Sequence, residues 1–197
     1  MLTRAARRLM LIVLLGMTPG LAEATEPDRR LAEAQGPVAA AMAQAHFRIA
    51  PGLRIELVAA EPAIESPVAM AFDEDGKLWV VEMRDYPNGP APGQPPEGRI
   101  RVLEDRDGDG RYEHSTVFAD RLLFANGLLP WKGGLVVTAA PHILYLKDTD
   151  GDGKADRRDV LYEGFTAKNP QLRVSHPVLG LGQQAKTRPR RRSLKDF

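Results

Sequence analysis

Two short stretches of the chain place a carboxylate at every second position, a spacing that suits metal binding. Each reads D-x-D-G-D-G and carries a further acid three residues after its second glycine. The candidate ligands are Asp105, Asp107, Asp109 and Glu113 in the first stretch, and Asp148, Asp150, Asp152 and Asp156 in the second. Calcium takes about six to eight oxygen ligands from carboxylates and backbone carbonyls, and a glycine permits the sharp turn that such a loop needs. We therefore predict two calcium loops.

The residues around these loops distinguish them from other acidic motifs. An EF-hand needs an acid at its last ligand position, where the first loop has Thr116, and strand-like segments rather than helices flank both loops. Without a cation, four carboxylates packed this closely would repel one another. The alternative is a solvated turn rich in Asp and Gly that holds no ion.

The segments that position the loops form an internal repeat. Asp105 and Asp148 are 43 residues apart, as are Arg99 and His142. Short apolar runs bounded by Gly, Pro, Asp and Asn predict four strands in each unit. The predicted strands are 68–72, 78–83, 99–104 and 115–119 in the first unit, and 127–130, 135–139, 142–147 and 158–163 in the second.

One interval breaks the spacing, because Leu78 and Leu135 are 57 residues apart. The excess of 14 residues marks the Pro/Gly-rich stretch 84–98 as an insertion between the second and third strands of the first unit. A period of about 40–45 residues with four strands is typical of a β-propeller blade. We predict an all-β fold, a partial β-propeller of two to three four-stranded blades.

Composition and the N-terminal residues bear on location. The formal net charge of +1 gives no global field that favours nucleic acid, and the absence of cysteine excludes disulfides, thiolate zinc sites and c-type haem attachment within these residues. Arg4, Arg7 and Arg8 precede the apolar run 9–17 and the small-residue site 22–24, which predicts a secretory signal peptide and an exported, periplasmic or extracellular protein. An uncleaved anchor is the alternative.

The predicted segments are a signal peptide at 1–24, a partly helical lead-in at 25–46, a partial β-propeller at 47–181 and a disordered basic tail at 182–197.

Several runs of sequence resemble one family. These are PGLRIELVAAEP at 51–62, SPVAMAFDEDGKLWVVEMRDYP at 66–87, the two acidic loops, and NPQLRV at 169–174. They resemble the N-terminal part of the membrane-bound dehydrogenases of planctomycete and verrucomicrobial type, whose propeller is similar to glucose/sorbosone dehydrogenases. The resemblance implies oxidation of a sugar or alcohol with pyrroloquinoline quinone, a c-type cytochrome as electron acceptor, and membrane association of the full-length protein.

The same resemblance suggests roles for four residues. His176 would be the base that takes the hydroxyl proton, and Arg84, Tyr86 and Arg173 would contact the anionic quinone. Alternatively, His176 is an ordinary surface or hydrogen-bonded residue, and Arg84 forms a salt bridge with Glu82 or Asp85. In a propeller, the insertion would line the ligand-binding mouth, and the acidic loops would lie at the opposite end of the strands.

The resemblance ends after Leu181, where residues 182–197 lack strand periodicity and contain Arg190, Arg191 and Arg192. This segment is either a basic tail or the product of a frameshift or truncation. We therefore expect a dehydrogenase-like fragment that is not catalytically complete alone. The alternatives are a non-catalytic calcium-stabilised binding module and a non-functional truncation.

Overall fold

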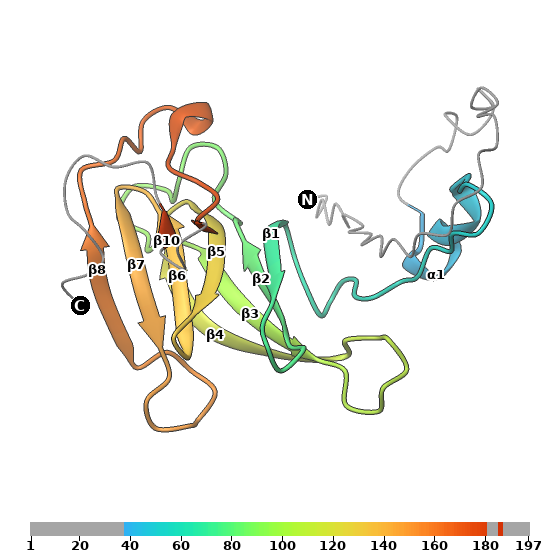
Figure 1. Cartoon of the computed structure of the whole chain (residues 1–197). Helices are drawn as coiled ribbons and strands as arrows, with labels where there is room; N and C mark the ends of the chain where they lie inside the picture. Colours follow the sequence, from blue (N-terminus) through green and yellow to red (C-terminus); the bar gives the residue numbers. More distant parts are fainter. Residues whose placement is uncertain (1–37, 181–184, 187–197) are drawn as a thin grey trace. The chain divides into compact units, whose positions relative to one another are not determined.

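The computed structural model describes residues 38–180 and 185–186, and strands dominate them (Figure 1). The predicted signal peptide, most of the lead-in and most of the basic tail lie outside the described residues. The chain divides into two compact units. The first contains the described residues up to Glu65 together with Asp105–His114, and the second contains Ser66–Glu104 and the described residues from Ser115 onward.

The first unit contains little regular structure. Helix α1 (Ala40–Ala43) and the 3₁₀ helix η2 (Gln44–His46) fall inside the predicted lead-in. Val58 and Ile64 are buried, and the backbone N–H of Tyr112 donates to the carbonyl of Val58 at 2.9 Å. This hydrogen bond joins the first acidic loop to the segment that precedes the sheets.

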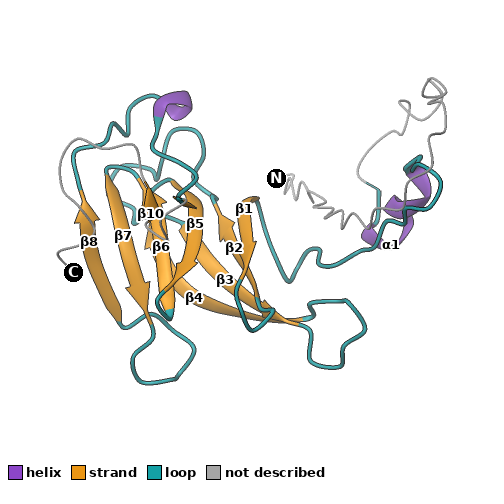
Figure 2. Cartoon of the chain, in the orientation of Figure 1, coloured by secondary structure: helices purple, strands orange, loops and turns teal. Residues whose placement is uncertain are grey.

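The second unit consists mainly of two four-stranded antiparallel sheets, each a simple meander (Figure 2). The first sheet contains β1 (Pro67–Phe72), β2 (Leu78–Glu82), β3 (Gly98–Glu104) and β4 (His114–Leu122). The second contains β5 (Ala125–Trp131), β6 (Gly134–Ala139), β7 (His142–Lys147) and β8 (Arg157–Tyr162). All eight predicted strands are confirmed to within three residues, and the fold is an all-β partial propeller with two complete blades.

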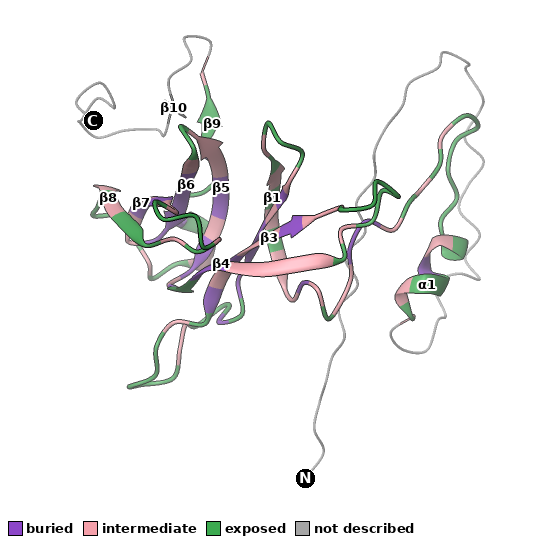
Figure 3. Ribbon diagram, turned by 90° about the horizontal axis from the view of Figure 1, so that it is seen from below, coloured by how far each residue is buried: buried purple, intermediate pink, exposed green. Residues whose placement is uncertain are grey.

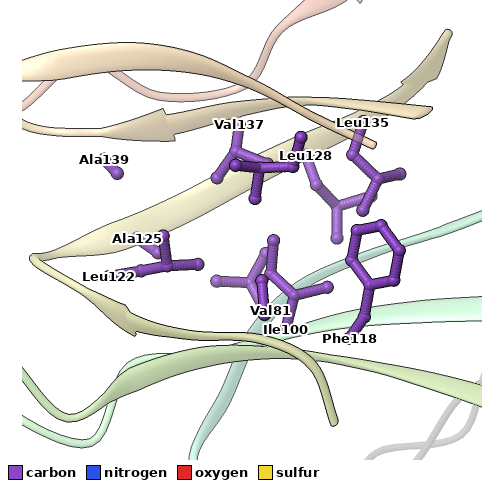
Figure 4. Close-up of a cluster of buried hydrophobic side chains, with 11 residues drawn as sticks. Val81, Ile100, Phe118, Leu122, Ala125, Leu128, Leu135, Val137 and Ala139 are labelled. Carbon is purple, nitrogen blue, oxygen red and sulfur yellow. The ribbon is translucent and has the colours of Figure 1, made fainter. Parts of the chain in front are cut away.

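A hydrophobic core joins the two blades (Figure 4). Val81 and Ile100 from the first blade face Leu128 and Val137 from the second, and all four are buried. The strand pairing explains this arrangement, because Val81 pairs with Ile100 and Leu128 pairs with Val137, so each pair projects from one face of its sheet. Burial is greatest in the inner strands and falls at the outermost strand β8 (Figure 3).

Tight turns set the register of the hairpins. The Asp73 carboxylate accepts the backbone N–H groups of Asp75 and Lys77, which closes the β1–β2 turn. Lys132 and Gly133 both have positive φ in the two-residue turn between β5 and β6, the conformation that matches the twist of paired strands. These turns hold each blade in register.

The insertion leaves the pairing of β2 with β3 intact. Leu78 pairs with Leu103 at one end, and Glu82 pairs with Arg99 at the other, where residues 83–97 leave the sheet. Because the excess residues project from one strand end, both blades keep the same four-stranded order.

After β8 the chain forms the 3₁₀ helix η3 (Pro170–Leu172) and the short strand β9 (Val178–Leu179). β9 pairs with β10 (Ala185–Lys186), so two residues of the segment expected to be disordered form a strand. Within the described parts of the chain, no helix is both long enough and apolar enough to span a bilayer.

Candidate functional site

The second acidic loop connects β7 to β8 and winds around its own carboxylates. Asp148 accepts the backbone N–H of Gly151 at 2.7 Å through one oxygen and that of Gly153 at 2.9 Å through the other. Asp150 accepts from the N–H of Asp152 at 3.3 Å. Both glycines have positive φ, a conformation that costs glycine little. The loop therefore positions its carboxylates through local backbone bonds.

The first loop connects β3 to β4 and repeats this bonding pattern. Asp105 accepts from Gly108 at 2.7 Å and from Gly110 at 2.9 Å, which matches the bonds of Asp148. Asp107 accepts from Asp109 at 3.2 Å, as Asp150 does from Asp152. The aspartate–glycine spacing thus produces the same local structure in both units.

The carboxylates converge as the sequence predicts, with one exception. Ligand oxygens from each loop lie within 4.8 Å of one another. The converging residues are Asp105, Asp107, Asp109 and Glu113 in the first loop, and Asp148, Asp150 and Asp152 in the second. Outside this group, Asp156 accepts from the backbone N–H of Thr149 at 2.7 Å and from its hydroxyl. The side chain of Asp156 is one methylene shorter than that of Glu113, and its hydrogen bonds with Thr149 keep it outside the converging group.

Calcium suits this donor set better than a transition metal does. The converging atoms are carboxylate oxygens, the hard ligands that calcium prefers, and they occur with neither histidine nor cysteine. Hydrogen bonds from Gly151 and Gly153 lower the pKa of Asp148, and those from the Thr149 side chain and backbone lower the pKa of Asp156. These carboxylates are therefore ionised at neutral pH, the form in which they bind a cation.

The residues suggested for quinone chemistry lie toward the other end of the strands. Arg173 is buried, and it donates to the carbonyls of Ala167 at 3.0 Å and Pro87 at 2.9 Å. Its guanidinium lies 3.3 Å from the ring centroid of Phe124. Burial lowers the pKa of Arg173. Arg173 therefore fastens the insertion to the segment that follows β8, and two of its nitrogens are already bonded.

The remaining three residues do not assemble around Arg173 into a catalytic group. Tyr86 is exposed, and its electrostatic interaction with Arg173 acts to raise the pKa of that arginine. Arg84 lines a hollow of about 580 Å³ along β4. His176 is exposed with a φ of 51°, and no hydrogen bond or ion pair joins it to the other three within the described residues. The roles suggested for these residues toward a quinone stay a prediction.

Two buried acids at this end had been suggested by the sequence only as salt-bridge partners of Arg84. Glu82 is fully buried and forms ion pairs with Arg99 and with Arg101, the latter at 3.1 Å but too bent for a hydrogen bond. Asp85 is also buried, neither of its carboxylate oxygens has a hydrogen-bond partner, and its charge acts to raise the pKa of Arg173. The alternation of Arg99 and Arg101 opposite an acid at the end of β2 was the available signal for the first acid.

Comparison with known proteins identifies a family without assigning an activity. No curated protein and no solved structure matches the chain. A domain of unknown function, DUF7133, matches residues 39–185, which include both acidic loops and both blades. The match covers about three quarters of the sequence, and the chain therefore belongs to the DUF7133 family.

Proposed function

We propose that this chain is a calcium-stabilised pair of propeller blades from an exported, sugar- or alcohol-dehydrogenase-like protein. The observation that carries the calcium proposal is the repeated loop geometry. Two connections, each between the third and fourth strands of a blade, bring at least three carboxylate oxygens within 4.8 Å. The dehydrogenase part rests on the sequence resemblance.

Calcium would act as a structural staple. The loops hold their carboxylates by local backbone bonds, and the chain has no cysteine with which to form disulfides. A cation bound only by the folded loop stabilises the fold by mass action, by about 2.7 kcal/mol at a concentration 100-fold above Kd. For a chain of this size, that corresponds to a rise in melting temperature of roughly 5–11 °C per site.

Thermal melting during a calcium titration tests this role. We expect calcium to raise the melting temperature and magnesium to raise it less, because magnesium dehydrates reluctantly and demands a stricter geometry. Asp107→Asn and Asp150→Asn should each remove part of the shift. Asp120→Asn, which changes an exposed aspartate outside both loops, is the matched control. A calcium shift that survives in the double variant of Asp107 and Asp150 would contradict the proposal.

We propose that the chain contributes scaffold rather than complete catalysis. Supporting this, two nitrogens of Arg173 are already bonded to carbonyls, and no bond links His176 to the other suggested residues within the described parts of the chain. Export, membrane association of a longer protein and electron transfer to a c-type cytochrome belong to the same proposal, on the resemblance alone. A non-catalytic calcium-stabilised binding module is the second candidate, and the two carbonyl bonds that already engage Arg173 favour it.

Titration with pyrroloquinoline quinone separates the two candidates. The dehydrogenase-like candidate predicts saturable binding that weakens in Arg84→Gln, measured by the absorbance of the quinone. The binding-module candidate predicts no saturable binding. Neither result depends on turnover, so each bears on the cofactor site itself.

A further inference from the structure

A hollow of about 320 Å³ lies within the second unit, at the blade end that carries the β1–β2 and β5–β6 turns. This volume falls in the range of small-molecule sites, about 300–1,000 Å³. Trp79 and Trp131 both line it, and they are the only two tryptophans in the chain. None of the residues suggested for quinone chemistry contributes to it.

Neighbouring groups fix the orientation of the two indoles. The Trp79 ring nitrogen donates to the Asp73 carboxylate at 2.7 Å, and its ring meets Phe118 edge-on with centroids 4.8 Å apart. Trp131 meets Tyr145 edge-on at 6.0 Å. Both indoles are only partly buried. The hollow therefore presents aromatic surface that is held in place before any ligand arrives.

The charges around the hollow favour a cation. Four acidic residues line it against two lysines, a formal excess of two negative charges. The acidic residues are Asp73, Glu74, Asp75 and Asp148, and the lysines are Lys77 and Lys132. Lys77 also pairs with Glu104 at 3.0 Å.

Trp131 already holds a cation of the chain itself. The Lys132 ammonium lies 4.5 Å from the centroid of the Trp131 ring. Lys132 is exposed and occupies a two-residue turn, so its side chain can swing into solvent without disturbing a strand. An indole face that attracts one ammonium group through its π electrons will attract another.

We propose that this hollow is a binding site for a small organic cation of the ammonium class. The cationic head takes the place of the Lys132 ammonium over Trp131, and the carboxylates at the rim balance its charge. This site shares Asp148 with the calcium proposal, is separate from the quinone proposal, and requires no covalent chemistry.

Tryptophan fluorescence of the full 197-residue chain tests the proposal, because both fluorophores line the hollow. Choline is the probe, and 3,3-dimethylbutan-1-ol, its uncharged isostere, is the matched control ligand. With calcium held constant, choline should change the fluorescence saturably and the isostere should not. An equal response to both ligands would show an apolar hollow instead, and the absence of a saturable response to choline would overturn the proposal.

Three substitutions and one control substitution sharpen the test. Lys132→Gln should tighten choline binding by about threefold or more, because the competing ammonium is removed. Trp131→Leu should weaken binding by about fivefold or more, read from the remaining Trp79. Glu74→Gln should weaken it, whereas Glu163→Gln, at an exposed position after β8, should not. If Lys132→Gln leaves the affinity unchanged or lowers it, the displacement mechanism is wrong.

Discussion

Replacing the buried Glu82 with glutamine should destabilise the first blade strongly. The Glu82 side chain is 0% exposed, while its partners Arg99 and Arg101 are 16% and 15% exposed. Glu82→Gln keeps the shape but removes the negative charge with which two largely buried guanidinium groups form ion pairs. Breaking a buried ion pair on one side typically costs about 3–5 kcal/mol. For a chain of this length, the melting temperature should fall by roughly 6–20 °C.

The control is a second acid of the same sheet. Glu104 pairs with Lys77 at 3.0 Å, and the two side chains are 27% and 43% exposed. Because solvent screens such a pair, Glu104→Gln should cost at most about 1 kcal/mol. Urea unfolding of both variants, monitored by circular dichroism, compares the two losses directly.

A triple variant distinguishes the loss of charge pairing from other causes of a failure to fold. Replacing Glu82, Arg99 and Arg101 together by methionine removes all three charges and fills the space with apolar groups, so much of the lost stability should return. If Glu82→Gln behaves like Glu104→Gln, the buried cluster does not carry the stability assigned to it. If the triple variant is no more stable than Glu82→Gln, unpaired buried charge is not the cause of the loss.

The other predictions concern close packing and the acidic loops. Gly98→Ala should cost about 1–3 kcal/mol in urea unfolding, because its added carbon would lie 2.2 Å from the carbonyl oxygen of Leu122 and the backbone must shift. Without calcium, the hydrogen bonds that lower the pKa values of Asp148 and Asp156 stabilise the fold above about pH 3.9. This stabilisation is lost as the pH falls through the lowered pKa values. Melting temperatures measured across this range should fall accordingly, and Thr149→Val should make that fall smaller. In calorimetric titrations, Glu113→Gln should weaken calcium binding more than Asp156→Asn does, since Asp156 lies outside its carboxylate group.

The strands could be predicted from the sequence because their signals are local. Alternating apolar residues and the turn residues between them depend on neighbours along the chain, and the 43-residue repeat reinforced each assignment. The largest difference is in β4, which begins one residue before the predicted Ser115 and extends to Leu122, beyond the predicted end at Ala119. The converging aspartates were equally local, because backbone bonds within each loop position them.

Features that depend on distant residues escaped prediction. Trp79 and Trp131 line one hollow only because the two blades pack together. Asp156 is an exception, because the donors of Thr149 that keep it outside the ligand group lie in its own loop. The hydrogen bond from Arg173 to the carbonyl of Pro87 joins residues 86 positions apart, and the role of Arg173 toward a cofactor stays a prediction. Spacing along the chain carries no information about such encounters.

The undisturbed pairing of Glu82 with Arg99 beneath the insertion has a consequence for how this family can diverge. Strand pairing in the first blade does not depend on how many residues connect β2 to β3, and lengthening a loop adds closure entropy only slowly. New sequence can therefore accumulate between these strands while the core stays the same. Among relatives, variation in length should concentrate at this one connection, where selection can alter what the strand ends recognise without redesigning the blade.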